Sequence, residues 1–287
     1  MSPLPSLADF RAQGRLVELR GHRIFVSEYG SGPPILFLHG FPTSSFDYAP
    51  LVPLLARKRR LILFDFLGYG YSDKPQNHNY SLFEQADIAV SVAQHCGLGP
   101  LTLVAHDMGS SVALELLRRP ELPIEKLVLL NGSVLLLHYR PLMTQRLLLH
   151  PQIGPLLTRL GLINRWVFAQ QFAKLFPVRP SDEELNLFWD LIRHNGGHRN
   201  YHLLIRYLLE RKQHELTWLD ALAASKVPLT VIWGQRDPVS VPAIAKDVLQ
   251  RRPDAKYVPL HEVGHYPQRE DRQTLARVIL GAQAMND

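Results

Sequence analysis

Cysteine is nearly absent from this sequence of 287 residues, which contains only Cys96. One cysteine cannot form a disulfide within the chain, and its apolar neighbours place it in a hydrophobic core. The N-terminal residues also lack an apolar run long enough for a secretion signal or a membrane anchor. We therefore expect a cytoplasmic protein without a membrane anchor.

Acidic residues are in the minority. The chain has 32 Lys and Arg against 26 Asp and Glu, which gives a net charge of +6. No aromatic residues are interleaved with the densest basic runs, at residues 57–60 and 251–252, so we expect these runs to be solvated helix ends. The sequence therefore predicts no nucleic-acid partner, and it leaves both a monomer and a homodimer open.

Short apolar strands alternate with helices in two separate parts of the chain. This alternation predicts an α/β fold with a mostly parallel, eight-stranded sheet that is covered by helices on both faces. Strands are predicted at residues 15–20, 23–29, 35–38, 61–64, 101–105, 126–130, 229–233 and 256–260, and helices at 44–56, 83–95, 110–119, 242–250 and 272–282.

A different pattern separates these two parts. Between residues 134 and 218 the apolar periodicity is helical throughout and is broken mainly by prolines. We expect residues 134–218 to form an inserted helical cap. The core of the fold would then consist of residues 1–133 and 219–287.

The residues around Asp107 have the pattern of a strand, a sharp turn and a helix. Ala105 and Gly109 supply small neighbours, which a strained turn needs because backbones pass closely there. This pattern presents Asp107 as a nucleophile at the apex of the turn, although an Asp that simply caps the helix is the alternative. The Gly-x-Ser-x-Gly pattern does not occur in the chain, so a serine nucleophile is not expected.

Two further polar residues follow predicted strands. Asp237 comes after the strand at 229–233, and His265 comes after the strand at 256–260. The carboxyl ends of the strands line one crevice in an open α/β sheet, and the order nucleophile, acid, histidine suits a catalytic triad. We therefore predict that Asp107, Asp237 and His265 are catalytic, with Asp237 orienting the imidazole.

A loop that ends another strand is expected to complete the site. His39-Gly40-Phe41-Pro42 follows the strand at 35–38. We predict an oxyanion hole formed by the backbone N–H groups of Phe41 and Met108.

An aspartate nucleophile points to a particular class of reaction. A carboxylate attacks an sp³ carbon and forms an alkyl ester, whereas attack on an acyl group would give a mixed anhydride. His265 would then activate water to attack the carbonyl carbon of the Asp107 ester, and the oxyanion hole would stabilise the resulting intermediate.

These residues resemble the epoxide hydrolase and haloalkane dehalogenase branch of the α/β-hydrolases, over nearly the whole chain. More closely, the chain is similar to the mesoderm-specific transcript protein-like hydrolases, at residues 37–46, 65–75, 80–85, 106–107 and 265–268. The resemblance implies the α/β-hydrolase fold with an inserted cap. It implies no particular substrate.

Departures from each branch separate the candidate activities. Haloalkane dehalogenases resemble this chain less, because they carry Asn and Trp as halide donors where Phe41 and Met108 stand here. Epoxide hydrolases resemble it better, but they use cap tyrosines to donate to the epoxide oxygen. The candidate cap donors are Tyr139, Tyr201 and Tyr207.

The cap is rich in Leu, Phe and Trp, which predicts an apolar pocket. We expect an epoxide hydrolase that needs no cofactor and acts on a small or medium apolar epoxide, with water as the second substrate. The alternatives are a haloalkane dehalogenase-type hydrolase, an esterase-like hydrolase, and a ligand-binding protein without turnover. No metal is expected, because Gly196-Gly197 breaks the helix that would align His194, His198 and His202.

Overall fold

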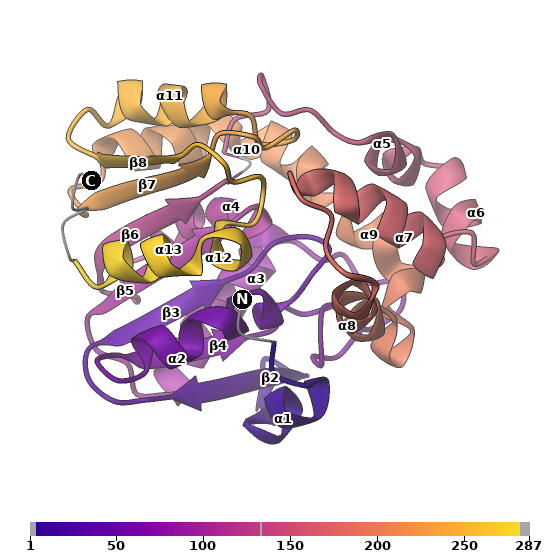
Figure 1. Ribbon diagram of the computed structural model, residues 1–287, viewed down its shortest axis with the longest axis horizontal. Coiled ribbons are helices and arrows are strands. Elements are labelled where there is room, and N and C mark those ends of the chain that lie inside the picture. Colours follow the sequence, from indigo (N-terminus) through magenta and orange to yellow (C-terminus); the bar gives the residue numbers. More distant parts are fainter. Residues whose placement is uncertain (1–3, 133, 282–287) are drawn as a thin grey trace.

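An eight-stranded sheet forms the centre of the molecule (Figure 1). The computed structural model describes residues 4–132 and 134–281. β2 runs antiparallel to its neighbours β1 and β4, and the remaining neighbours pair in parallel, which confirms the predicted fold class. In sheet order the strands are β1 (Gly14–Leu19), β2 (His22–Tyr29), β4 (Arg60–Phe64), β3 (Pro34–Leu38), β5 (Leu101–His106), β6 (Ile124–Leu130), β7 (Leu229–Gly234) and β8 (Lys256–Leu260).

Helices cover both faces of the sheet, and its central strands are therefore continuous apolar runs. α2 (Val52–Leu55) and α13 (Arg272–Ile279) pack together on one face. α3 (Leu82–His95), α4 (Met108–Leu116) and α10 (Tyr207–Ala224) pack together on the other. The core also contains α1 (Leu7–Ala12), the 3₁₀ helix η1 (Ser45–Leu51), α11 (Pro242–Arg251) and α12 (Pro267–Glu270).

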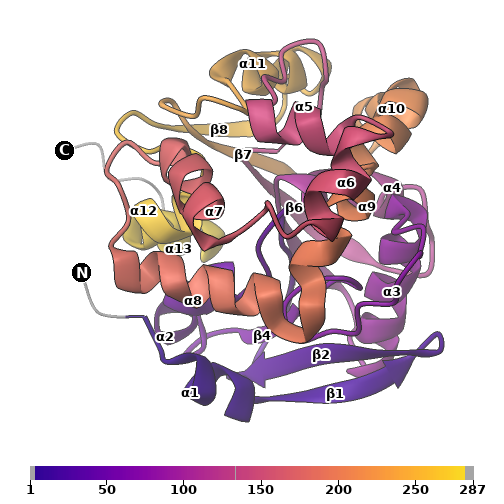
Figure 2. The same cartoon turned by 90° about the vertical axis from the view of Figure 1, so that its right-hand side faces the viewer.

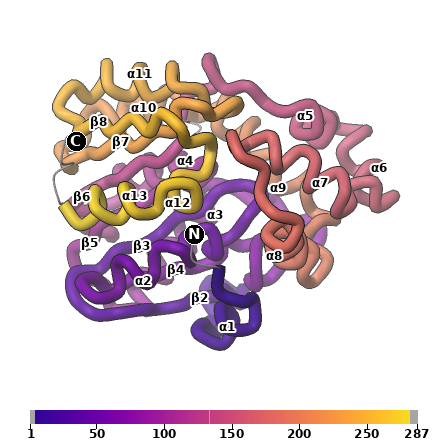
Figure 3. The backbone as a smooth tube through the Cα atoms, viewed as in Figure 1, coloured from indigo at the N-terminus to yellow at the C-terminus, as the bar shows by residue number. Residues whose placement is uncertain are grey.

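The described residues between β6 and β7 form helices but no strand. The inserted helices that precede α10 gather on one side of the core, and Figure 2 shows α5, α6, α7 and α8 in front of it. The chain then returns through α10, which packs against α4 (Figure 3). The inserted helices are α5 (Met143–Leu149), α6 (Ile153–Arg159), α7 (Arg165–Phe172), η2 (Ala173–Leu175), α8 (Asp182–Arg193), η3 (His194–Asn200), α9 (Tyr201–Leu204) and α10.

Several predicted boundaries differ from the structure. The helix expected at 44–56 is η1 followed by α2, because Pro50 and Pro53 lack the N–H that a continuous helix needs. α4 begins at Met108, directly after Asp107, and ends three residues earlier than expected, ahead of Pro120. The last helix ends at Ile279, and Ala282, where we expected its end, lies outside the described residues.

The limits of the cap at residues 134 and 218 remain a prediction, and Ser133 beside the first limit is not among the described residues. Within the part of the chain that the structure describes, no helix is both long and apolar enough to cross a membrane.

Candidate active site

Asp107 lies in a strained turn between β5 and α4. Its backbone angles, φ 47° and ψ −117°, fall in a region that costs an L residue about 1–3 kcal/mol. The carboxylate is buried, and the backbone N–H of Phe41 donates a hydrogen bond to its Oδ1 at 2.9 Å. The side chain makes no capping bond to the first turn of α4, all of which is described, so this geometry favours a functional carboxylate over a helix cap.

Two glycines permit this turn because the backbones around it lie very close together. A Cβ atom on Gly109 would lie 2.5 Å from the carbonyl oxygen of Leu38 at the end of β3. A Cβ atom on Gly40 would lie 2.5 Å from the Cβ of Asp107. Both distances are too short for a side chain at either position. The turn at Asp107 and the loop after β3 can therefore pack this closely only with glycine at both positions.

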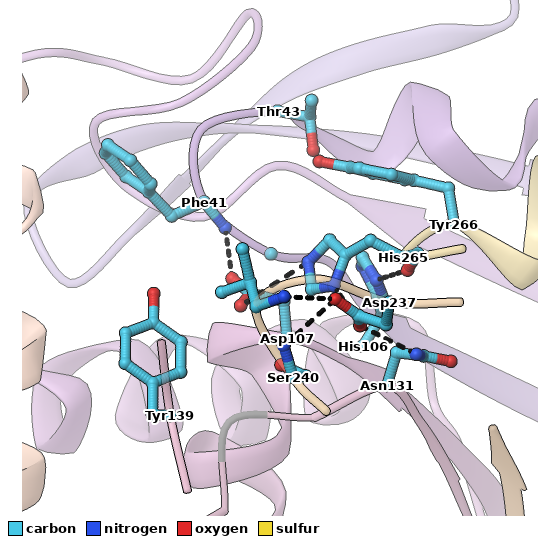
Figure 4. Close-up of polar contacts among 12 residues, drawn as sticks. Phe41, Thr43, His106, Asp107, Asn131, Tyr139, Asp237, Ser240, His265 and Tyr266 are labelled. Atoms are coloured by element: carbon cyan, nitrogen blue, oxygen red, sulfur yellow. Dashed lines mark hydrogen bonds and ion pairs between the residues drawn. The ribbon is translucent and has the colours of Figure 1, made fainter. Parts of the chain in front are cut away.

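His265 lies between two carboxylates (Figure 4). Its Nδ1 is 2.6 Å from Oδ2 of Asp237, and its Nε2 is 3.8 Å from Oδ2 of Asp107. All three side chains are buried. The structure thus brings together the three residues that the sequence predicts as a triad, which come from the ends of β5, β7 and β8.

Asp237 is held by more partners than the sequence indicates. The backbone N–H groups of Val239 and Ser240 donate to its Oδ1 at 2.8 and 2.9 Å. The side-chain amide of Asn131 donates to its Oδ2 at 2.7 Å and accepts from the N–H of Gly234 at 2.8 Å. Asn131 was not predicted as a site residue, although its place directly after β6, the neighbour of β7, is a signal for it.

The two carboxylates keep His265 charged. Burial alone would lower the pKa of His265, but the charge and hydrogen bond of Asp237, together with the charge of Asp107, raise it to about 9. Burial would likewise raise the pKa of Asp237, but the charge of His265 together with the hydrogen bonds from His265, Val239 and Asn131 lowers it. At neutral pH His265 is therefore an imidazolium between two carboxylates.

Two further buried histidines stay neutral next to this ion pair. Burial and the charge of His265 lower the pKa of His106 to about 4, and its Nε2 donates to the carbonyl oxygen of His265 at 2.7 Å. Burial lowers the pKa of His39 to about 3, and its Nε2 accepts from the N–H of Phe66 at 3.0 Å. His106 and His39 thus support the loops without adding charge, a role that the sequence did not reveal.

One predicted oxyanion donor contacts Asp107, and the other directly follows it in the chain. Phe41 already donates to its Oδ1. Met108 is the first residue of α4, where backbone N–H groups have no partner within the helix. Neither side chain can donate a conventional hydrogen bond into the pocket.

A pocket of about 640 Å³, its open mouth included, lies above Asp107 and His265. Its wall comes from the core on one side and from α5 and α7 on the other. The lining is mainly apolar and includes Phe41, Leu142, Leu148, Ile163, Phe168 and Leu175. This mainly apolar lining suits an apolar molecule.

One of the three predicted cap tyrosines lines the pocket, and Tyr139 and Tyr207 are not among its lining residues. Tyr201 lines the pocket, and its buried hydroxyl has no hydrogen-bond partner among the described residues. The hydroxyl of Tyr139 accepts a hydrogen bond from Gln145 and points toward the side where Phe41 and Asp107 lie (Figure 4). Burial and then the charge of Asp107 raise the pKa of both Tyr139 and Tyr207, so each hydroxyl keeps its proton.

A group of metal-ligand type lies outside this pocket lining. The ligand atoms of His22, His78 and Glu84 lie within 4.8 Å of one another at the starts of β2 and α3, and His78 already forms a 2.7 Å pair with Glu84. The absence of a metal or cofactor from the reaction remains a prediction.

Comparisons with known proteins agree with this architecture. Residues 33–271 match the alpha/beta hydrolase fold family. The chain is 40% identical to LipZ of Mycobacterium tuberculosis, which is named as a hydrolase, over 96% of this chain and 97% of LipZ. It is 36% identical to the mesoderm-specific transcript protein of Mus musculus, over 96% of this chain and 88% of that protein.

Solved structures show the same arrangement. An alpha/beta hydrolase fold protein from Burkholderia ambifaria matches with a TM-score of 0.81 at 20% identity, over 97% of this chain and 99% of that one. The haloalkane dehalogenase DbeA from Bradyrhizobium elkani matches with a TM-score of 0.78 at 26% identity, over 93% of this chain and 96% of that one. The chain therefore belongs to the alpha/beta hydrolase fold family and is a hydrolase of that superfamily.

Proposed function

We propose that the protein is an epoxide hydrolase that works through a covalent ester on Asp107. The observation that carries this proposal is the environment of the Asp107 carboxylate. Asp107 lines the pocket; its Oδ1 accepts a backbone hydrogen bond, and its Oδ2 lies 3.8 Å from Nε2 of His265. Oδ2 would therefore attack the substrate, and Oδ1 would carry the negative charge during hydrolysis of the ester.

In the first step Oδ2 attacks an epoxide carbon. A new bond forms between Oδ2 and that carbon while the carbon–oxygen bond of the ring breaks. A tyrosine hydroxyl at the pocket donates its proton to the ring oxygen as it leaves. The proton that the His265 imidazolium then loses returns to the tyrosinate through water. The product is a hydroxyalkyl ester of Asp107, and nothing is expelled.

In the second step water hydrolyses this ester. Ester formation removes the negative charge of Asp107, one of the charges that raise the pKa of His265, so the imidazolium loses its proton more readily. Neutral His265 then takes a proton from water, and the hydroxide attacks Cγ of Asp107. The negative charge develops on Oδ1, where Phe41 already donates and Met108 is the second proposed donor.

The intermediate collapses by breaking the bond between Cγ and Oδ2. The diol leaves with Oδ2 and takes the proton held by His265. The new carboxylic acid contains the oxygen of water, and it gives its remaining proton to His265, which restores the carboxylate and the imidazolium. Asp237 stabilises the imidazolium throughout, because it holds Nδ1 at 2.6 Å.

Halide displacement is the second candidate, and one observation favours it. Haloalkane dehalogenases are among the similar proteins, and a 113-residue segment of this chain is 32% identical to haloalkane dehalogenase 2 of Mycobacterium bovis. A halide leaving group needs hydrogen-bond donors, however, and the side chains of Phe41 and Met108 supply none. The buried tyrosine hydroxyls suit an epoxide oxygen better, because that oxygen needs a proton.

Product analysis tests the proposed function. Purified protein is incubated with a panel of alkyl and aryl epoxides, with chloro- and bromoalkanes and with short-chain esters. We expect steady-state release of diols from at least one epoxide. Release of halide without release of any diol would favour the second candidate, and binding without turnover would favour a ligand-binding protein.

Removing the tyrosine that protonates the epoxide oxygen should slow ring opening. Among the variants Tyr139→Phe, Tyr201→Phe and Tyr207→Phe, we expect one or two to lose about 2–4 kcal/mol of transition-state stabilisation, by analogy with an oxyanion donor. The rate of ester formation in a single turnover is the quantity to measure. Tyr29→Phe is a matched control. Tyr29 pairs with Leu61 at the start of β4, whereas the site lies at the carboxyl ends of the parallel strands. Full epoxide turnover in all three cap variants would show that the proton comes from another group.

A further inference from the structure

The first part of the cap carries charge of one sign only. Residues 134–181 contain six Lys and Arg and neither Asp nor Glu. The other 26 basic residues of the chain equal its 26 acidic residues, so this segment accounts for the whole net charge of +6. Arg146 and Arg159 are exposed there, and neither forms an ion pair with any described residue.

Large apolar side chains are exposed on the same segment. Of the twelve exposed large apolar residues in the described chain, seven lie between residues 143 and 166. We name these seven residues the apolar cap face. They are Met143 and Leu147 on α5, Ile153 and Leu156 on α6, and Leu160, Leu162 and Trp166 from there to the start of α7.

Helix periodicity shows which side of α6 the apolar cap face occupies. Ile153, Leu156 and Leu160 follow one another at spacings of three and four, which places them on one outward stripe along α6 and its end. Gly154 and Thr158 on the opposite stripe are buried. Figure 2 shows α5, α6 and α7 together on the side of the molecule that faces the viewer.

The apolar cap face lies directly outside the pocket. On α5, Leu147 is exposed and its neighbour Leu148 lines the pocket. On α7, Trp166 is exposed and its neighbour Val167 lines the pocket. α5 and α7 thus separate solvent from the pocket by the thickness of one helix. A molecule held against the apolar cap face would be next to the pocket wall.

We propose that the apolar cap face docks on an anionic lipid surface and that the protein takes its apolar substrate from there. Exposed apolar residues rimmed by Arg, with a Trp that is 67% exposed, are the combination that binds at the interface of a membrane with anionic lipids. Charge argues against a second copy of this chain as the occupant. Pairing the face with itself would bring cations against cations, with no acidic residue in the segment to compensate.

The inference rests on the proposed function only for the substrate route, because binding to lipid can be measured without turnover. The protein is mixed with vesicles of phosphatidylglycerol and phosphatidylcholine, or of phosphatidylcholine alone, and the bound fraction is measured by sedimentation. We expect binding to the anionic vesicles, which weakens steeply as salt rises from about 0.1 to about 0.5 M.

Matched variants locate the contact. The pair Leu156→Gln and Trp166→Gln should reduce the vesicle-bound fraction about tenfold or more, because it removes two exposed apolar side chains that would insert into the lipid. Leu216→Gln on α10 should not, although Leu216 is 74% exposed. The pair Arg146→Gln and Arg159→Gln should also weaken binding, whereas Arg57→Gln with Lys58→Gln removes the same charge elsewhere and should have a much smaller effect.

Fluorescence reports insertion directly. Trp218 and Trp233 are buried and Trp189 is half-buried, so Trp166 is the strongly exposed tryptophan. Brominated lipids should quench the wild-type emission, and this quenching should be lost in Trp166→Phe. Three results would overturn the proposal. They are no vesicle binding at low salt, equal binding by the variants of the apolar cap face and their controls, and self-association through this face. Turnover of a water-soluble epoxide, measured without vesicles, tests the proposed function separately.

Discussion

The variant Asp107→Ala is expected to lose turnover of every substrate. No other group at the elbow is positioned to form the ester, and removal of a nucleophile costs about 10⁶-fold in kcat where a triad acts as a unit. Steady-state diol release by the wild type and the variant, at equal concentrations of folded protein, measures the loss. Thermal unfolding of both proteins shows whether the fold is retained.

Ser110→Ala is the matched control for this experiment. It removes one buried hydroxyl from the same elbow, and that hydroxyl has no hydrogen-bond partner among the described residues. We expect it to keep near wild-type turnover. If Asp107→Ala kept near wild-type turnover, the assignment of the nucleophile would be wrong.

Replacing Asp237 by asparagine should nearly abolish the hydrolysis of the ester. Asn keeps the shape of the side chain but can no longer stabilise the imidazolium or fix its tautomer, which costs about 10⁴-fold in kcat in a triad of this kind. The rise of the hydrolysis rate with pH should also shift to lower pH, because Asp237 is the main group that raises the pKa of His265. Asp254→Asn, which removes an exposed carboxylate paired with the buried Arg252, should leave both quantities unchanged.

The same variant should change how stability depends on pH. The pKa of His265 is raised from 6.5 to about 9 in the folded protein, so its ion pair stabilises the fold fully below pH 6.5 and loses that effect as pH rises through about 9. The difference in unfolding free energy between the wild type and Asp237→Asn should therefore shrink over this range. A difference that stays constant would mean that His265 is not charged at neutral pH.

The sequence was sufficient to predict the sheet and the convergence of Asp107, Asp237 and His265, because both follow from the pattern of strands and the residues at their ends. Buried parallel strands are continuous apolar runs, and their carboxyl ends meet along one edge, so polar residues after β5, β7 and β8 had to converge. The elbow was recognisable because a strained turn requires small residues, and Gly109 indeed has no room for a side chain.

Contacts between distant segments could not be predicted in the same way. Asn131 reaches Asp237 across 106 positions, and His106 reaches the backbone of His265 across 159. Neither contact leaves a periodic trace in the sequence. The rule that strand ends converge would have placed Asn131 near Asp237, but it gives neither the direction of the side chain nor its hydrogen bonds.

The cap illustrates a second limit. α5 carries apolar residues on both its inner and outer sides, as Leu148 and Leu147 show, so its periodicity does not distinguish the wall of the pocket from the exposed surface. The positions of Tyr139, Tyr201 and Tyr207 relative to Asp107 also depend on how the cap packs on the core. The sequence could name these tyrosines as candidates but could not rank them.

The central claim is that the reaction passes through an ester on Asp107, and intact-protein mass spectrometry of His265→Gln tests it most directly. The variant should still be alkylated, since attack by Oδ2 does not need the base, and should then stall because no group activates water. With an epoxide that the wild type hydrolyses, we predict a stable adduct with the whole mass of the epoxide, mapping by peptide digestion to the segment that contains Asp107. A haloalkane would add its mass less that of the hydrogen halide. The absence of an adduct, or an adduct on Ser110 or Ser111, would contradict the covalent mechanism on Asp107.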